Sequence, residues 1–266
     1  MSTVLESRRV GKRFGDFAAV TDVSYRLELG EAAGIIGPNG AGKSTLFNLL
    51  TGLHRPTSGA VMLEGRDVTA TRADQRVGLG LVRTFQLVSV FESLPAIDNL
   101  VLSVLHARDP RPGALSFLLG HARSTQTQRD ALAALERVGL ADRAPTPVSA
   151  LSYGDKRKLE IAMALSLKPR VLLLDEPLAG LSDGEILEVL ALVRGLRGSL
   201  SLVIIEHKIS HVLDLVSRLS VMHEGRLIAD GPPDAILADP VVRKVYWGDE
   251  VRPALVQHGP PTRAGA

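Results

Sequence analysis

The stretch GPNGAGKS, residues 37–44, contains the most specific chemical pattern in this chain of 266 residues. It fits G-x-x-x-x-G-K-[ST] and lies between an apolar run, AAGIIG, and a segment with helical spacing, STLFNLLTG. Glycines let the backbone curl until successive N–H groups face a phosphate chain, Lys43 neutralises the β and γ phosphates, and the Ser44 hydroxyl can ligate Mg²⁺. This pattern in this context predicts a phosphate-binding loop.

Two further apolar runs end in groups that suit phosphate chemistry. RVLLLDE ends in Asp175 and Glu176, and SLVIIEH ends in His207. The carboxyl ends of parallel strands meet at one sheet edge, where ligands of open α/β folds bind. We expect Asp175 to hold Mg²⁺ through water and Glu176 to polarise an attacking water as general base. An acidic pair or a lone His at a strand end is also an ordinary surface feature, and Gln86 in LVRTFQ carries no signal by itself.

The stretch LSYGD, residues 151–155, precedes a run of apolar residues at helical spacing. Ser152 therefore lies at the N-cap of a predicted helix, and Asp155 three positions later completes a capping box. A helix N-terminus flanked by Gly154 also offers backbone N–H groups and a positive dipole end to an anion. Both interpretations are open when this stretch is taken alone.

The elements that must position these residues alternate between strands and helices. The N-terminal stretch RRVGKRFGDFAAVTDVSYRLELGE predicts a small antiparallel sheet, because apolar residues recur there at a period near two: Val20, Val23, Tyr25, Leu27 and Leu29. SGAVMLEGRDVT continues this sheet, with Gly59 and Gly65 at its turns. The continuous apolar runs further on are typical of strands buried on both faces of a parallel sheet, with helices such as DGEILEVLALVRGL between them.

Composition limits the classes of function. The hydrophobic share of 45% and the charged share of 23% are those of a globular protein. A formal charge of +2 is too balanced for tight nucleic-acid binding, so no nucleic-acid partner is expected. The chain contains no cysteine, which excludes disulfides and thiolate metal sites and fits a reducing cytosol. The longest apolar runs, VLLL and LVII, are far too short to span a membrane, so we expect a cytoplasmic protein whose membrane role comes through a partner.

The order of these motifs resembles the ATP-binding subunit of an ABC transporter from about Arg8 to Gly248: GPNGAGKST, Gln86, LSYGD, VLLLDE, AGLSD and His207. Three stretches resemble the subunits of branched-chain amino acid uptake systems: RTFQLVSVFESLPAIDNL, LSYGDKRKLEIAMAL and VVRKVYWG. The resemblance implies an α/β fold, with a P-loop NTPase core of mainly parallel sheet, an N-terminal antiparallel β subdomain and an inserted helical subdomain. We expect one ATP-binding domain over residues 1–250, the helical insertion at about 87–150, and a mobile tail over 251–266.

The resemblance also implies ATP and Mg²⁺ as cofactors and assigns roles to individual residues. The phosphate loop would contact ATP through Gly37, Pro38, Asn39, Gly40, Ala41, Gly42, Lys43, Ser44 and Thr45. Phe14 in KRFG occupies the place of the aromatic that stacks on adenine, with Phe17 as the other candidate and a core position as the alternative explanation. Gln86 would sense Mg²⁺, which Ser44 and Asp175 also hold, and would couple it to the helical subdomain.

Two further implied roles concern the γ-phosphate. His207 would contact it and position the attacking water. LSYGD corresponds to the family signature, so Ser152 and Gly154 would face a nucleotide held by a second copy of the chain. The sequence departs from the commonest family pattern at Tyr153 and Asp155, where Gly and Gln are frequent. It also departs at two further positions where Asp is usual, which are Ser182 and Lys208.

The partners implied are transmembrane permease subunits, a second ATP-binding subunit, which is either the same chain or a paralogue, and indirectly an extracytoplasmic solute-binding protein. The chain would then lie at the inner face of the cell membrane. The region 87–150 resembles the part that docks onto permease loops, with surface positions expected near Phe91, Leu94 and Asn99.

Two alternatives within the family are the ATPase of a lipid or lipopolysaccharide export system, which can end in a similar VYWG-like sequence, and a non-transport ABC ATPase. The stretch RTFQLVSVF argues against the first. The second usually joins two ATP-binding halves or inserts long coiled coil, and the sequence shows neither. A P-loop kinase would have no use for LSYGD.

Overall fold

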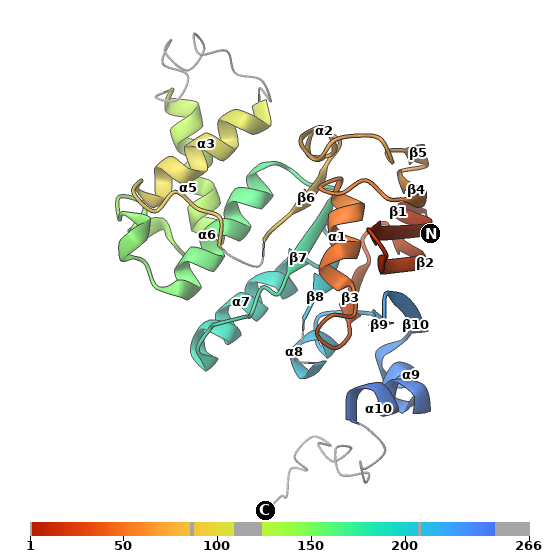
Figure 1. The fold of residues 1–266 in the computed structure, drawn as a ribbon. Coiled ribbons are helices and arrows are strands. Elements are labelled where there is room, and N and C mark those ends of the chain that lie inside the picture. The colour runs from red at the N-terminus through yellow and green to blue at the C-terminus, as the bar shows by residue number, and fades with distance from the viewer. Residues whose placement is uncertain (1, 86–87, 109–123, 207–208, 248–266) are drawn as a thin grey trace, which may run out of the picture.

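The computed structural model describes residues 2–85, 88–108, 124–206 and 209–247. Figure 1 shows two sheets beside a group of helices. The strands are β1 (Thr3–Phe14), β2 (Phe17–Glu28), β3 (Ala32–Ile36), β4 (Ser58–Leu63), β5 (Arg66–Asp67), β6 (Leu81–Arg83), β7 (Val171–Asp175), β8 (Ser201–Ile205), β9 (Arg218–His223) and β10 (Arg226–Gly231). The α-helices are α1 (Lys43–Thr51), α2 (Ala73–Gly78), α3 (Ala96–Arg108), α5 (Thr125–Arg137), α6 (Tyr153–Ser166), α7 (Asp183–Leu196), α8 (Ile209–Leu213), α9 (Pro233–Ala238) and α10 (Pro240–Trp247). The expected tail 251–266 lies outside the described residues.

The central sheet has six strands in the order β10-β9-β3-β8-β7-β6. Its neighbouring strands from β9 to β6 pair in parallel, and β10 pairs with β9 in the antiparallel sense. Every residue of β3, β7 and β8 is buried, as their continuous apolar sequences predict. Because Asp175 at the end of β7 is in register with Ile205 at the end of β8, these strands end at one edge. The predicted α/β fold with a mainly parallel sheet is confirmed.

The second sheet is antiparallel, with the order β2-β1-β4-β5. The predicted period-two pattern in β2 slips by one residue between Val20 and Val23, and both side chains are nevertheless buried. Asp22 lies between them with φ of 53°, a left-handed conformation that forms a bulge and returns the strand to its original face. The pattern was wrong at Leu29, which follows the end of β2 in a turn at Gly30 and is exposed.

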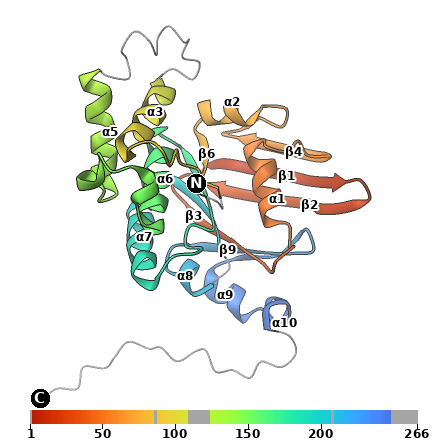
Figure 2. The ribbon, with the colours of Figure 1, turned by 60° about the vertical axis from the view of Figure 1, so that its left-hand side comes forward.

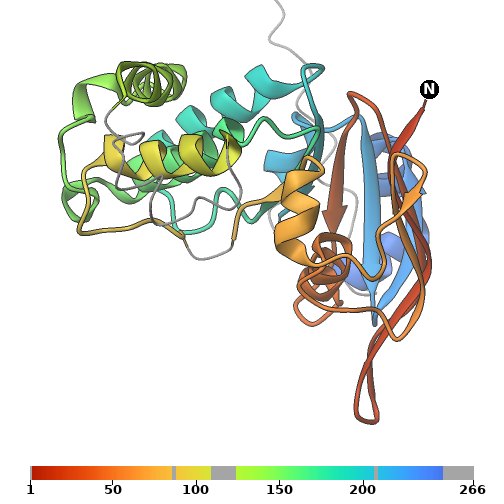
Figure 3. The same cartoon turned by 90° about the horizontal axis from the view of Figure 1, so that it is seen from above.

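Two hydrophobic cores cover the faces of the central sheet. Helix α1 lies between the two sheets, where Leu46, Phe47 and Leu50 pack against both (Figure 3). On the opposite face, Ile186 and Val189 of α7 pack against the central strands together with α8. The phosphate loop therefore connects a strand and a helix that are both anchored in packed layers.

The helices α3, α5 and α6 form a separate core beside the sheets (Figure 2). Leu100, Leu135 and Leu159, one from each helix, are fully buried in it. Helix α6 follows the predicted 87–150 insertion, yet Leu159 belongs to this core while Ile161 packs against strands of the central sheet. The helix that begins at LSYGD thus connects the helical core to the central sheet.

A buried arginine holds the C-terminal end of α1. The helix ends, as predicted, at Gly52, which has φ of 80°. The Arg76 guanidinium lies directly behind this turn, and its Nη1 donates to the carbonyls of Leu49 at 2.8 Å and Leu50 at 2.5 Å. Its Nη2 donates to the carbonyl of Val68 at 2.6 Å. Burial lowers the pKa of Arg76 to about 10, so the guanidinium stays charged at neutral pH.

We predict that Arg76→Met lowers the free energy of unfolding by about 3–5 kcal/mol, because several buried carbonyls lose their donor at once. Urea unfolding followed by circular dichroism measures this change. Arg72→Met is the matched control, since Arg72 is exposed and its ion pair among the described residues is with exposed Asp74; its effect should stay within about 0.5 kcal/mol. Equal stability of the two variants would contradict the role assigned to Arg76.

Candidate functional site

The loop from Gly37 to Gly42 leaves β3 and enters α1 in a conformation that only glycine allows at two positions. A Cβ on Gly37 would lie 2.3 Å from the Met222 carbonyl oxygen, and one on Gly42, with φ of 97°, would lie 2.6 Å from the Ala19 carbonyl oxygen. The loop is therefore pressed against β9 and β2 on its inner side. Asn39 and Gly40 remain exposed on its outer side. This is the form of backbone that a phosphate-binding loop requires.

Lys43 begins α1 and is buried beneath this loop. Its Nζ donates to the carbonyls of Gly37 at 2.7 Å and Pro38 at 3.1 Å. Burial lowers the pKa of Lys43, whereas the nearby carboxylates of Glu176 and Asp175 act in the opposite sense. The Lys43 ammonium group, which would face the β and γ phosphates, is thus held in place by carbonyls of the phosphate loop itself.

Asp175 is fully buried at the end of β7 and pairs with Arg83, a residue of the neighbouring strand β6. Nη2 of Arg83 lies 2.5 Å from Oδ2 of Asp175, and Nη1 donates to Oδ1 of Asn48 on α1 at 2.5 Å. The guanidinium also contacts the ring of Phe47, 5.4 Å from its centroid. Oδ1 of Asp175 is buried without a hydrogen-bond partner among the described residues. One carboxylate oxygen is fixed by Arg83 and the other remains able to accept.

The donor set fits Mg²⁺. The described residues contain no group of three or more His, Cys, Asp or Glu side chains that could hold a metal by themselves. Mg²⁺ keeps several waters and binds through one or two protein oxygens together with substrate phosphates, which suits the free Oδ1 of Asp175 and the exposed hydroxyl of Ser44. These two residues would hold the ion, which would neutralise charge on the phosphates.

Glu176 follows Asp175 directly and is also buried. Its φ of 48° is left-handed, and its N–H donates to the Ile205 carbonyl of β8 at 2.9 Å. A non-glycine residue in this conformation costs about 1–3 kcal/mol and persists where the surrounding structure imposes it. The Glu176 carboxylate lies near Lys43, where its charge partly offsets the lowering of the Lys43 pKa by burial.

Phe14 lies at the end of β1 and is 46% exposed, so the alternative explanation of a core aromatic does not apply. Its ring meets the His54 ring edge-on with centroids 5.5 Å apart, and Lys12 Nζ lies 5.1 Å from its centroid. Phe17 is more exposed still, at 66%. Either ring presents a face on which a base could stack.

Ser152 is the N-cap of α6, and its Oγ accepts from the Asp155 N–H at 3.1 Å. The Asp155 carboxylate pairs with Lys158 at 2.8 Å. The N–H of Gly154 donates to Oε1 of Glu185, the third residue of α7, at 2.8 Å. The predicted N-cap at Ser152 is confirmed, but the predicted capping box is not, because the Asp155 carboxylate pairs with Lys158 instead of reaching back to Ser152. The N-terminus of α6 already holds an anion from its own chain, the Glu185 carboxylate.

Further along α6, a buried ion pair holds the segment that leads to Gln86. Arg157 and Glu160 pair at 2.7 Å. Nη1 of Arg157 donates to the Phe85 carbonyl at 2.9 Å, and the Phe85 N–H donates to Oε1 of Glu160 at 3.1 Å. Three predicted or noted positions, Gln86, His207 and Lys208, lie outside the described residues.

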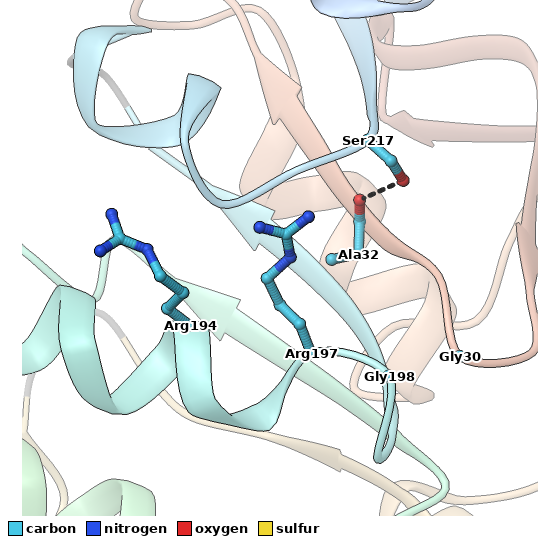
Figure 4. A pocket seen from close by; sticks show the side chains of 6 residues that line it. All are labelled: Gly30, Ala32, Arg194, Arg197, Gly198 and Ser217. Carbon is cyan, nitrogen blue, oxygen red and sulfur yellow. Dashed lines mark hydrogen bonds between the residues drawn. The ribbon is translucent and has the colours of Figure 1, made fainter.

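A pocket of about 360 Å³ lies at the opposite end of the central sheet from the phosphate loop (Figure 4). Ala32, which begins β3, lines it together with Arg194, Arg197 and Ser217. Ser217 Oγ donates to the Ala32 carbonyl at 3.2 Å, and Arg197 donates to the Asp214 carbonyl at 3.2 Å. No residue predicted from the sequence to be functional lines this pocket.

Sequence reasoning missed the residues that hold the site together: Arg83, Arg157 and Glu185. Arg83 could have been noticed, because it is a charged residue in the apolar run GLVRTF. Arg157 and Glu160 have the spacing of a helical ion pair. For Glu185 the available signal was the capping-box spacing after Ser182, which the structure confirms.

Comparison with known proteins gives two family matches. The model described as ABC transporter matches residues 20–179, and the model described as branched-chain amino acid ATP-binding cassette transporter matches residues 226–251.

Curated relatives and a solved structure agree with these matches over nearly the whole chain. The protein is 39% identical over 243 residues to the high-affinity branched-chain amino acid transport ATP-binding protein LivG of Salmonella typhimurium, covering 89% of this chain and 94% of that protein. It is 37% identical over 251 residues to the lipopolysaccharide export system ATP-binding protein LptB of Acidithiobacillus ferridurans, covering 94% and 99%. The crystal structure of the ADP conformation of MJ1267, an ATP-binding cassette of an ABC transporter, superposes with a TM-score of 0.82 at 30% identity, covering 94% of this chain and 100% of that one.

We predict strong coupling between Arg83 and Asp175, whose side chains are 8% and 2% exposed. In a double-mutant cycle with Arg83→Met and Asp175→Asn, the coupling energy from urea unfolding should be about 2–4 kcal/mol, because Arg83→Met alone leaves a buried carboxylate unpaired. The exposed pair Arg9 and Asp22 is the control, with an expected coupling below about 1 kcal/mol. Additive effects of Arg83→Met and Asp175→Asn would show that the pair does not fix the carboxylate.

Proposed function

Because the chain belongs to the ABC transporter family and is an ATP-hydrolysing subunit of a transporter, we propose that it powers the import of branched-chain amino acids or a related small solute. The observation that carries the choice of solute is the match of residues 226–251 to the branched-chain family model. The similarity to LivG of Salmonella typhimurium supports the same choice.

In the proposed reaction, Lys43 and the backbone N–H groups of the phosphate loop bind the β and γ phosphates of ATP. Asp175, oriented by Arg83, and Ser44 would hold Mg²⁺, which would neutralise charge on the phosphates. Glu176 takes a proton from the attacking water, with His207 and Gln86 completing the site as the sequence resemblance implies. The carboxylates of Glu176 and Asp175 both act on the pKa of Lys43, and this proximity of the three charged groups supports the assignment.

In the proposed assembly, two ATP-binding subunits enclose each ATP between the phosphate loop of one and the α6 N-terminus of the other. Asn39 and Gly40 on the outer side of the phosphate loop and Ser152 at the start of α6 are exposed residues, which supports this arrangement. A nucleotide on the phosphate loop alone would leave the γ-phosphate open to solvent. The second subunit would supply the missing donors and exclude water.

The proposed membrane partners are permease subunits, which place the chain at the inner face of the cell membrane, with a solute-binding protein acting outside. Among the described residues no helix has both the length and the apolar character that crossing a membrane requires.

Phe91 is 55% exposed and supports a docking surface at the start of the helical subdomain. The expectation of a surface position at Asn99 was wrong, because Asn99 is fully buried. Its side chain bonds to both backbone groups of Phe91, at 2.8 and 3.1 Å.

A second candidate function is the ATPase of a lipopolysaccharide export system, which the similarity to LptB of Acidithiobacillus ferridurans favours. Deletion of the gene separates the two. The import proposal predicts loss of uptake of radiolabelled leucine, isoleucine and valine, restored by the natural chain and not by Glu176→Gln. Normal uptake together with loss of lipopolysaccharide from the cell surface would favour the export function instead.

We predict that Glu176→Gln retains ATP binding and lowers the rate of hydrolysis by about 10²–10⁴-fold, because the phosphate loop is intact while the water loses its base. Steady-state phosphate release measures the rate, and titration with a fluorescent nucleotide measures binding. Glu224→Gln is a matched control, since Glu224 also has a left-handed backbone after a strand of the central sheet but follows β9. Retention of most of the turnover by Glu176→Gln would remove Glu176 from the role of base.

A further inference from the structure

The donors at the N-terminus of α6 are already in use within the isolated chain. Glu185 is the third residue of α7, and its Oε1 accepts from the N–H of Gly154 at 2.8 Å. The Ser152 side chain also lies close enough to this carboxylate to help lower its pKa. These are the two residues through which, under the proposed function, α6 contacts ATP held by the partner.

The carboxylate lies directly on the Gly154 peptide. A Cβ on Gly154 would come within 2.6 Å of both Cγ and Oε1 of Glu185, so only glycine permits this approach. The hydrogen bonds from Ser182, followed by those from Gly154 and Ser152, lower the pKa of Glu185 to about 2. Glu185 is therefore an anion at neutral pH, placed at the positive end of a helix of 14 residues.

A carboxylate and a γ-phosphate need the same donors. The Gly154 N–H can make one strong hydrogen bond at a time, and two anions at this distance would repel each other. ATP on the partner subunit must therefore displace Oε1 of Glu185 before it can bind Gly154.

The other carboxylate oxygen has its own anchor. Oε2 of Glu185 accepts from the Ser182 N–H at 3.0 Å and from the Ser182 hydroxyl at 2.7 Å. The bond from the Ser182 N–H belongs to the capping box of α7, and neither contact involves an atom of α6. Glu185 can leave Gly154 and still cap α7, so its release from the signature does not require α7 to unfold.

We infer that Glu185 occupies the place of the partner's γ-phosphate in the isolated chain, and that this internal anion sets the ATP concentration at which two subunits close. The inference rests on the proposed function, because it needs Ser152 and Gly154 to meet ATP in trans. Each subunit thus carries a competitor for the contact that closes the dimer.

Sedimentation velocity with increasing ATP tests the inference, using the full chain with Glu176→Gln to prevent hydrolysis. Adding Glu185→Gln replaces the competing charge with a neutral amide of the same shape, and the ATP concentration for half-maximal dimerisation should fall about tenfold. Glu188→Gln is the matched control. Glu188 lies one turn further along α7 and also pairs with α6, through Lys158 at 2.7 Å, but it touches neither Ser152 nor Gly154 by any contact described above. Its midpoint should equal that of the parent.

The direction of the change separates competition from a structural role. If Glu185 only stabilised the α6–α7 contact, its loss would weaken dimerisation, so an unchanged or higher midpoint for Glu185→Gln overturns the inference. Glu185→Asp provides a second variant should Glu185→Gln fail to fold, because the shorter side chain keeps its charge near Ser182 but withdraws from Gly154. Glu185→Asp should also lower the ATP concentration for half-maximal dimerisation.

If the Glu176→Gln parent itself stays monomeric with saturating ATP, the proposed dimer fails and the inference fails with it. Closure by the parent with no shift in either variant contradicts the inference alone.

Discussion

The structure depends on keeping a buried cation and two buried carboxylates at one edge of a parallel sheet without neutralising them completely. Lys43, Asp175 and Glu176 are each less than about a tenth exposed, and charges so buried are normally paired. Here Lys43 donates to loop carbonyls, and only one oxygen of Asp175 is taken by Arg83. Oδ1 of Asp175 is thereby left able to accept, so that a hydrated cation bound together with a phosphate chain would complete its contacts.

The packed layers around this edge explain why the incomplete pairing is tolerated. Strands β3, β7 and β8 are buried throughout. Helix α1 packs against both sheets, and Arg76 donates hydrogen bonds to carbonyls at its C-terminal end. Helix α6 extends this rigid frame into the helical subdomain, since its residues belong to both cores. The Arg157–Glu160 pair of α6 hydrogen-bonds to the backbone of Phe85, and the Gly154 N–H at its N-terminus donates to Glu185. The contact with Glu185 and the contact with the segment before Gln86 are therefore made by the same helix.

The sequence was sufficient where the signal is local. The glycine pattern of the phosphate loop, the continuous apolar strands and the bounds of α7 follow from periodicity and cap residues over a few positions. The bulge at Asp22 was not predicted, because residues other than glycine seldom adopt a left-handed conformation. Arg83 and Asp175 are 92 positions apart, and the contact between Glu185 and Gly154 joins residues 31 positions apart. Such pairs are brought together by strand order and helix packing, which no local pattern contains.

The central claim is that each ATP site is built from two subunits, and cross-linking tests it most directly because the chain has no cysteine of its own. Asn39 and Ser152 are both exposed. A tagged Asn39→Cys chain is mixed with an untagged Ser152→Cys chain, both carrying Glu176→Gln, and oxidised with and without ATP. The account predicts an ATP-dependent product that joins one tagged and one untagged chain. Absence of that product, together with a cross-link inside a single chain that carries both cysteines, would contradict it.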